Sequence, residues 1–122
     1  MEVQGNHGFT LLELLTVVAI VGILTSIAVP QFAAYKKRAY DVSARSDLRN
    51  VAIAEEAYFI DSESYLTCAN SGCAILPGIA SLTSGVTLAI ISTTTGFSGT
   101  ATHNKGTGKT FIWNTSQGGM QP

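Results

Sequence analysis

The sequence lacks carboxylates where a catalytic domain would need them. After Glu63 it contains no acidic residue, and Lys105 and Lys109 are the only fixed charges in that half of the chain. A catalytic triad around His103 would have no carboxylate to orient the imidazole, and acidic calcium ligands are missing there as well. The formal net charge is −1, and no basic cluster is interleaved with stacking aromatics. These absences argue against an enzyme and against a nucleic-acid partner.

Cysteine and histidine are also scarce. Cys68 and Cys73 are the only cysteines, and no histidine lies near them, so they make a poor zinc site. In an exported protein the two thiols are expected to form a disulfide, whereas in the cytosol they would stay reduced. The segment 108–110 (GKT) resembles the end of a phosphate-binding loop, but that motif needs a glycine where this chain has His103. We therefore expect neither a metal nor another cofactor.

The longest apolar run extends from Phe9 to Val29 and contains one charge, Glu13. At about 1.5 Å of rise per residue, a helix of this length crosses a hydrocarbon core of roughly 30 Å. Gly22 and Pro30 weaken such a helix, because glycine lowers helix propensity and proline removes a backbone hydrogen bond. We predict a kink at these residues in the isolated subunit; local unwinding during repacking is the functional alternative. The run, with Pro30, forms a predicted transmembrane and assembly segment, residues 9–30.

The first eight residues, MEVQGNHG, are polar and lack helical periodicity. An ordinary secretory signal places its apolar region before the cleavage site, but here the apolar region follows the candidate site at Gly8. Cleavage between Gly8 and Phe9 would leave the hydrophobic helix on the mature protein. We therefore interpret residues 1–8 as a leader peptide of an unusual kind.

Residues 31–62 predict an amphipathic helix that continues the first one. Its polar side includes the neighbouring pair Glu55-Glu56, which we interpret as a solvated face, together with other charges such as Asp41 and Asp47. The apolar residues that lie close to one stripe are Phe32, Tyr35, Ala39, Val42, Ser46, Ile53, Ala57 and Ile60.

Residues 63–122 predict a small globular domain of loops and antiparallel strands. Three β-like runs, 86–92, 96–103 and 109–115, are separated by links of hairpin length and turn composition. A short helical turn is expected around 79–83. The predicted class is α+β, with a long N-terminal helix packed on a sheet of three to four antiparallel strands, one face of which is free to pack on the amphipathic helix.

The segment Gly8-Phe9-Thr10-Leu11-Leu12-Glu13, followed by the apolar helix, closely resembles the class III signal of type IV pilins, a signal that secretion pseudopilins share. The resemblance implies that a membrane prepilin peptidase cuts after Gly8 and methylates the new amino group of Phe9. It also implies that Glu13 faces the N-terminal amine of a neighbouring subunit during assembly. A carboxylate in an apolar bundle needs a cation, so Glu13 would also act as a check on register.

The resemblance further implies a function, partners and a location. The chain would be a type IVa major pilin, held in the bacterial inner membrane with its C-terminal domain in the periplasm, and then part of an extracellular pilus. Its partners would be copies of itself in a helical filament, the peptidase and the pilus assembly machinery. The alternative is a major pseudopilin of a type II secretion system. Those pseudopilins bind calcium through acidic side chains near the C-terminus, which this chain lacks.

Within the family the N-terminal half is most similar to pilins of the Geobacter type, whose filaments are proposed to conduct electrons. Six rings carry this likeness, and we interpret them as packing residues rather than as a conducting path. The leader departs from the family in having no lysine or arginine. The basic residues Lys36, Lys37 and Arg38 follow the membrane segment, so the positive-inside rule alone would place the C-terminal domain in the cytoplasm; the peptidase signal places the leader there instead. The six rings are Phe9, Phe32, Tyr35, Tyr40, Phe59 and Tyr65.

Overall fold

The structure is a computed structural model that describes residues 1–2 and 5–122. One long helix is followed by short strands and two short 3-10 helices, so the predicted α+β class is confirmed. In chain order the elements are α1 (Leu11–Ser62), β1 (Cys68–Ala69), η1 (Asn70–Ile75), β2 (Val86–Ser92), β3 (Phe97–His103), β4 (Phe111–Asn114), η2 (Thr115–Gln117) and β5 (Gly119–Met120).

Two compact units share the helix α1. The first unit is Met1–Ala34 and the second is Tyr35–Pro122. The helix is continuous through Gly22 and Pro30, and the predicted kink at these residues stays a prediction. In the first unit every described residue is exposed, whereas the second unit holds all of the buried residues.

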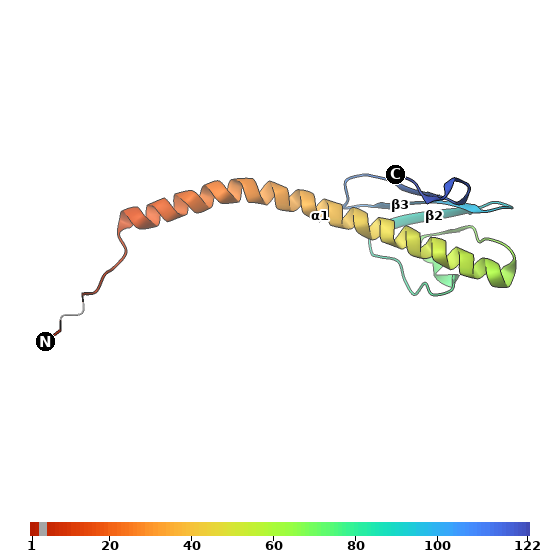
Figure 1. The fold of residues 1–122 in the computed structure, drawn as a ribbon, viewed down its shortest axis with the longest axis horizontal. Coiled ribbons are helices and arrows are strands. Elements are labelled where there is room, and N and C mark those ends of the chain that lie inside the picture. Colours follow the sequence, from red (N-terminus) through yellow and green to blue (C-terminus); the bar gives the residue numbers. More distant parts are fainter. Residues whose placement is uncertain (3–4) are drawn as a thin grey trace. The chain divides into compact units, whose positions relative to one another are not determined.

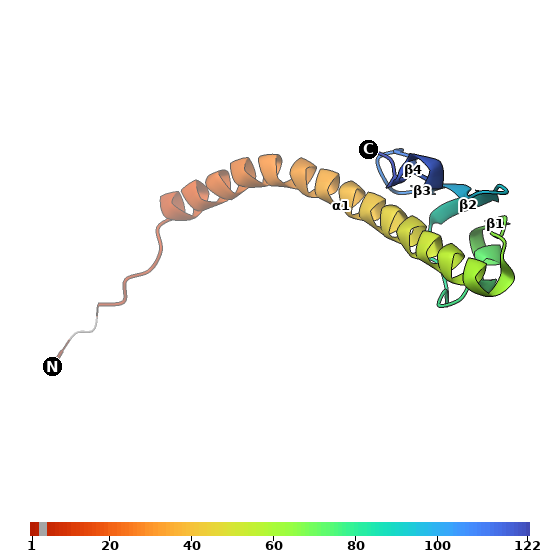
Figure 2. The same ribbon diagram turned by 45° about the vertical axis from the view of Figure 1, so that its right-hand side comes forward.

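The sheet belongs to the second unit and is antiparallel throughout, with the strands in the order β1-β2-β3-β4-β5 (Figures 1 and 2). It therefore has five strands, and the prediction of three to four was too low. The extra strands β1 and β5 have two residues each, which is too short to produce a readable alternation. The hairpin between β2 and β3 closes where Thr93 N–H donates to the Gly96 carbonyl at 2.7 Å.

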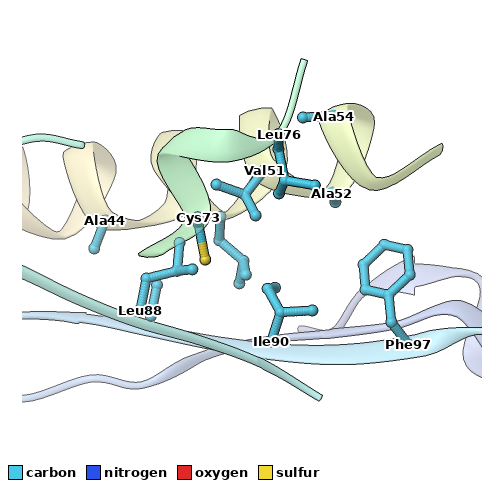
Figure 3. Packing of buried hydrophobic residues seen from close by; sticks show 11 residues of the cluster. Ala44, Val51, Ala52, Ala54, Cys73, Leu76, Leu88, Ile90 and Phe97 are labelled. Carbon is cyan, nitrogen blue, oxygen red and sulfur yellow. The ribbon is translucent and has the colours of Figure 1, made fainter. Parts of the chain in front are cut away.

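The core lies between the sheet and the part of α1 within the second unit. Figure 3 shows Leu88 and Ile90 of β2 and Phe97 of β3 pointing toward α1, where Val51 lies opposite. The close approach of helix and sheet depends on Gly99 in β3. A Cβ there would lie 2.9 Å from Leu48 Cδ1 and 2.5 Å from Ile90 Cδ1, so a larger residue would force the ends of these two core side chains to shift.

The face of α1 that covers the sheet is not the predicted apolar stripe. Residues two positions apart in a helix point about 200° apart, so Val42 faces away when Ala44 faces the sheet. The stripe side chains are mostly exposed: Val42 by 64%, Ile53 by 60% and Ile60 by 79%. The covering face was missed because alanines and acids make up much of it. Its buried residues are Asp41, Ala44, Asp47, Leu48, Val51, Ala52, Ala54 and Glu55.

The connection from α1 to β2 also differs in one detail from its prediction. No helical turn forms around 79–83; a 3-10 helix, η1, occupies Asn70–Ile75 instead. The predicted disulfide between Cys68 and Cys73 is confirmed, with the two Cα atoms 5.1 Å apart. The bridge ties β1 to η1, and Asn70 Oδ1 accepts a hydrogen bond from Leu88 N–H at 3.0 Å. The short helix is therefore fastened to the sheet by a covalent and a polar link.

Candidate assembly site

Thr10 and Glu13 close the N-terminus of α1 with a reciprocal pair of hydrogen bonds. Thr10 N–H donates to Glu13 Oε2 at 2.9 Å, and Glu13 N–H donates to Thr10 Oγ1 at 3.2 Å. This is a capping box, in which two otherwise unpaired backbone donors are satisfied. This capping role was not predicted from the sequence, although Thr-x-x-Glu before an apolar run is its signature.

The cap explains part of why a carboxylate stands in an apolar segment. A cap contributes roughly 1 kcal/mol and the helix dipole about 0.3–1 kcal/mol. Placing a carboxylate in the hydrocarbon interior costs up to about 2.5–3.5 kcal/mol on insertion scales. The local gains therefore fall short of the largest cost, and a cation near Glu13 would make up the difference.

The apolar part of α1 has no partner within the chain. Among the described residues, α1 is the one helix long and apolar enough to cross a membrane. None of the residues in its most apolar 18-residue stretch is buried. Leu12 is 73% exposed and Val18 68%. Beside the first turns lies an open hollow of about 620 Å³ with an almost wholly apolar lining, to which Phe9, Glu13 and Val17 contribute. Such a surface is stable only against lipid or against other apolar helices.

The predicted cleavage site lies outside the helix. Gly8 and Phe9 precede α1, which begins at Leu11, and the ring of Phe9 is 88% exposed. A Cβ on Gly8 would meet no atom within 4 Å. The fold of this chain therefore places no steric demand for glycine at position 8, so a requirement for it would arise from a molecule that binds the segment.

In the second unit, Asp41 and Asp47, which were predicted on the polar side of the amphipathic helix, are buried. Asp47 accepts hydrogen bonds from Thr83 N–H at 2.7 Å and from the Thr83 hydroxyl at 3.1 Å. Asp41 accepts from Thr107 N–H at 3.0 Å and from the hydroxyl of the same residue. Each carboxylate thereby holds one loop against α1. The loops have no acidic residue of their own, so the acceptors come from the helix.

Glu55 is a third buried acid, and its assignment to a solvated face was wrong. Its side chain is fully buried, and Oε2 accepts a hydrogen bond from Leu66 N–H at 2.9 Å. Oε1 has no partner among the described residues. Burial raises the pKa of the Glu55 carboxyl; the Leu66 hydrogen bond lowers it, and the charge of Glu56 raises it. The folded subunit therefore favours the neutral form of Glu55 more than the unfolded chain does.

Three of the six aromatic residues singled out in the sequence pack inside the second unit. Tyr40 stacks on His103 with ring centroids 4.5 Å apart, and His103 Nδ1 accepts from Lys105 N–H at 3.0 Å. Phe59 stacks on Tyr65 at 4.6 Å, and Tyr65 contacts Phe97 of the core at 5.1 Å. These three rings thus have packing partners within the chain, and the interpretation against a conducting path stays a prediction.

The chain matches known proteins over part of its length. Residues 4–29 match the family described as the prokaryotic N-terminal methylation motif. The type IV major pilin protein PilA of Myxococcus xanthus is 40% identical over 65 residues, which are 53% of this chain and 30% of that protein. The type IV wide pilus major component PilA4 of Thermus thermophilus is 37% identical over 89 residues, 73% of this chain and 66% of that protein.

A secretion protein matches over a similar length. The type II secretion system core protein G of Pseudomonas aeruginosa is 35% identical over 65 residues, 53% of this chain and 46% of that protein. The matched parts thus cover between 30% and 66% of these three relatives.

The long helix packed on an antiparallel sheet gives the chain a pilin-like fold, and its N-terminus matches the methylation motif. The chain is a homologue of type IV major pilins, and it is also related to the pseudopilins of type II secretion. The named relatives are pilus and secretion-system proteins, so a structural role is indicated.

Proposed function

We propose that this chain is a structural subunit of a type IV pilus, without enzymatic activity. Prepilin peptidase would cut after Gly8 and methylate Phe9, and the assembly machinery would move α1 from the inner membrane into a filament. The C-terminal domain would lie in the periplasm before assembly and on the pilus surface afterwards.

One observation supports this proposal: the methylation motif, residues 4–29, includes the apolar part of α1, and that part has no partner within the chain. About 25 cal/mol is gained for each Å² of apolar surface removed from water. The exposed apolar part of α1 is therefore expected to lie in lipid or among copies of itself. The motif supports both environments in succession, because cleavage after Gly8 would leave the helix on the mature chain.

The pseudopilin alternative is less well supported. A pilin and a pseudopilin match this chain about equally, at 40% and 35% identity over 65 residues. The match to the wide pilus component is longer, at 89 residues. The sequence after Glu63 also has no carboxylate with which to bind calcium as the major pseudopilins do.

Substitutions of Glu13 test the proposal, because they separate the helix cap from the charge. Gln at this position can still complete the capping box, but it cannot neutralise an amine. Both Glu13→Ala and Glu13→Gln should give cleaved, membrane-inserted protein at wild-type level, and at least tenfold fewer sheared filaments by electron microscopy and immunoblot. Wild-type amounts of filament from Glu13→Gln would refute the proposed role of the charge. If the wild-type chain appears only in an inner-membrane secretion complex, the pilus assignment is wrong.

A further inference from the structure

Two arginines and a tryptophan form a cavity on the second unit. Arg45 and Arg49 are exposed and lie one helical turn apart on α1, so their side chains share a face. With Trp113 and Met120 they line a cavity of about 270 Å³, to which Gly118 also contributes. Within the described residues neither guanidinium forms an ion pair. The cavity is thus lined by two guanidinium groups and an indole ring.

The chain supplies no anion of its own to this cavity. The acids nearest in sequence, Asp41 and Asp47, are buried and hold Thr107 and Thr83. The strands and loops after Glu63 contain no acid. Within the second unit the exposed cations of α1 therefore lie toward its start, and the exposed acids lie at and just after the end of the helix.

The acidic residues at the end of α1 lie where the helix dipole disfavours negative charge. The last turn contains no basic residue, and Asp61 and Glu63 place negative charge at the negative end of the helix dipole. Glu63 also has φ of 52°, in the left-handed region where glycine is favoured, and its N–H donates to the Phe59 carbonyl at 2.8 Å. Both acids are exposed, and neither has a cation partner among the described residues. Residues that break local rules in this way often serve an interaction outside the subunit.

We propose that the arginine cavity receives the Asp61–Glu63 segment of a second copy of this chain. The two groups cannot meet within one chain, because the 12–18 residues between them span about 18–27 Å of helix. When two parallel copies are shifted along the helix axis by about 20 Å, the arginines of one copy lie beside the acidic segment of the other. Without this shift, arginines lie beside arginines and acids beside acids. A guanidinium binds a carboxylate through two parallel hydrogen bonds, so the contact also fixes orientation.

The inference rests on the proposed function, which supplies parallel copies that enter a filament one after another. The copy that donates the acids would be the one nearer the membrane, since its helix end lies level with the arginines of the copy added before it. Together with Glu13, the contact would provide a second check on register, outside the apolar core of the filament.

Charge exchange in the full-length chain tests the contact. Arg45→Glu with Arg49→Glu should reduce sheared filaments at least tenfold, and so should Asp61→Arg with Glu63→Arg. Combining all four substitutions should restore at least a third of the wild-type amount. The control is Lys105→Glu with Lys109→Glu, which changes the net charge as much as the arginine pair does but lies outside the cavity lining, and it should leave filaments unchanged. Cleaved subunit in the membrane is quantified for every variant.

A single substitution separates this contact from a role in folding. Glu63→Gly suits the left-handed backbone and removes the charge from the helix end, so the detergent-solubilised full chain should unfold at the same temperature or higher while filaments fall severalfold. Normal filaments from Glu63→Gly, or from either charge-reversed pair, would overturn the contact. Failure of the fourfold variant to recover, when its subunit is folded and cleaved, would overturn it too. A wild-type chain that forms no filaments would instead contradict the proposed function.

Discussion

The two units use one helix in opposite ways. In Met1–Ala34 every described side chain of α1 is exposed, although most are large and apolar. In Tyr35–Pro122 the buried face of the helix consists largely of alanines and carboxylates, and it is covered by the sheet and the loops. The strongly apolar part of α1 is therefore the part without a partner inside the chain, whereas the face of α1 that packs on the sheet consists largely of small or acidic side chains.

The largest expected effect on stability comes from replacing a leucine of α1 with alanine in the second unit, and the same replacement in the first unit is the control. Leu48 is completely buried against the sheet, so Leu48→Ala should reduce the free energy of unfolding of the second unit by roughly 2–5 kcal/mol. Leu15, on the same helix, is 60% exposed, and Leu15→Ala should leave that unfolding unchanged. Chemical denaturation of the full chain in detergent, followed by the fluorescence of Trp113, measures both. Equal effects would show that the division between the units is wrong.

The acids of α1 provide a second comparison, between a buried carboxylate and an exposed one. Asp47→Ala removes both acceptors from Thr83 and should cost roughly 1.5–3 kcal/mol, the range for hydrogen bonds to charged groups. The matched control is Asp61→Asn, an exposed acid on the same helix, for which a change within about 0.5 kcal/mol is expected. Hydrogen exchange should show faster opening at Thr83 in the first variant. Wild-type protection there would contradict the assigned role of Asp47.

The disulfide should have an effect of intermediate size that is confined to the second unit. Opening the six-residue loop between Cys68 and Cys73 should cost about 2 kcal/mol by the chain-entropy relation. Replacing both cysteines with serine, and comparing thermal unfolding with and without a reducing agent, measures this. The double variant should be insensitive to the reductant and still be inserted in the membrane. A loss of membrane insertion would mean that the two units do not fold independently.

Glu55 should give the smallest effect, which depends on pH. Its carboxyl pKa is raised by burial in the folded state, with Glu56 and Tyr65 as the titratable groups beside it. Its contribution to stability is therefore fully present below its ordinary pKa of about 4.5 and is lost as the pH rises through the folded value. Glu55→Gln keeps an acceptor for Leu66 N–H without the charge, so it should match the wild type near pH 4 and exceed it by about 1 kcal/mol at pH 7. A variant less stable than the wild type at pH 7 would reverse the assigned sign.

Sequence patterns predicted the elements of this fold better than their packing. The apolar run, the three main strands and the Cys68–Cys73 bridge were predicted because length, alternation and cysteine count report on them directly. The face of α1 toward the sheet was not, because Ala44 and Ala52 give little hydrophobic signal while Val42 and Ile53 give a strong one. Hydropathy alone cannot separate a face that packs within the chain from one that awaits a partner.

The partners of the polar residues could not be predicted at all. Asp41 lies 66 positions before Thr107, and no local pattern connects them. The capping box of Thr10 and Glu13 is the opposite case, since both residues stand within one turn and their spacing was readable. Local polar contacts are thus open to prediction from sequence, while those between helix and loop depend on the tertiary fold.

The structure of sheared surface filaments, determined by cryo-electron microscopy, tests the central claim most directly. The claim predicts subunits that begin at Phe9, with the apolar part of α1 buried among neighbouring helices. It also predicts Glu13 within about 3 Å of a neighbouring N-terminal amine, and a second unit folded as described here. Filaments that retain residues 1–8, or that leave this part of α1 facing solvent, would contradict the claim.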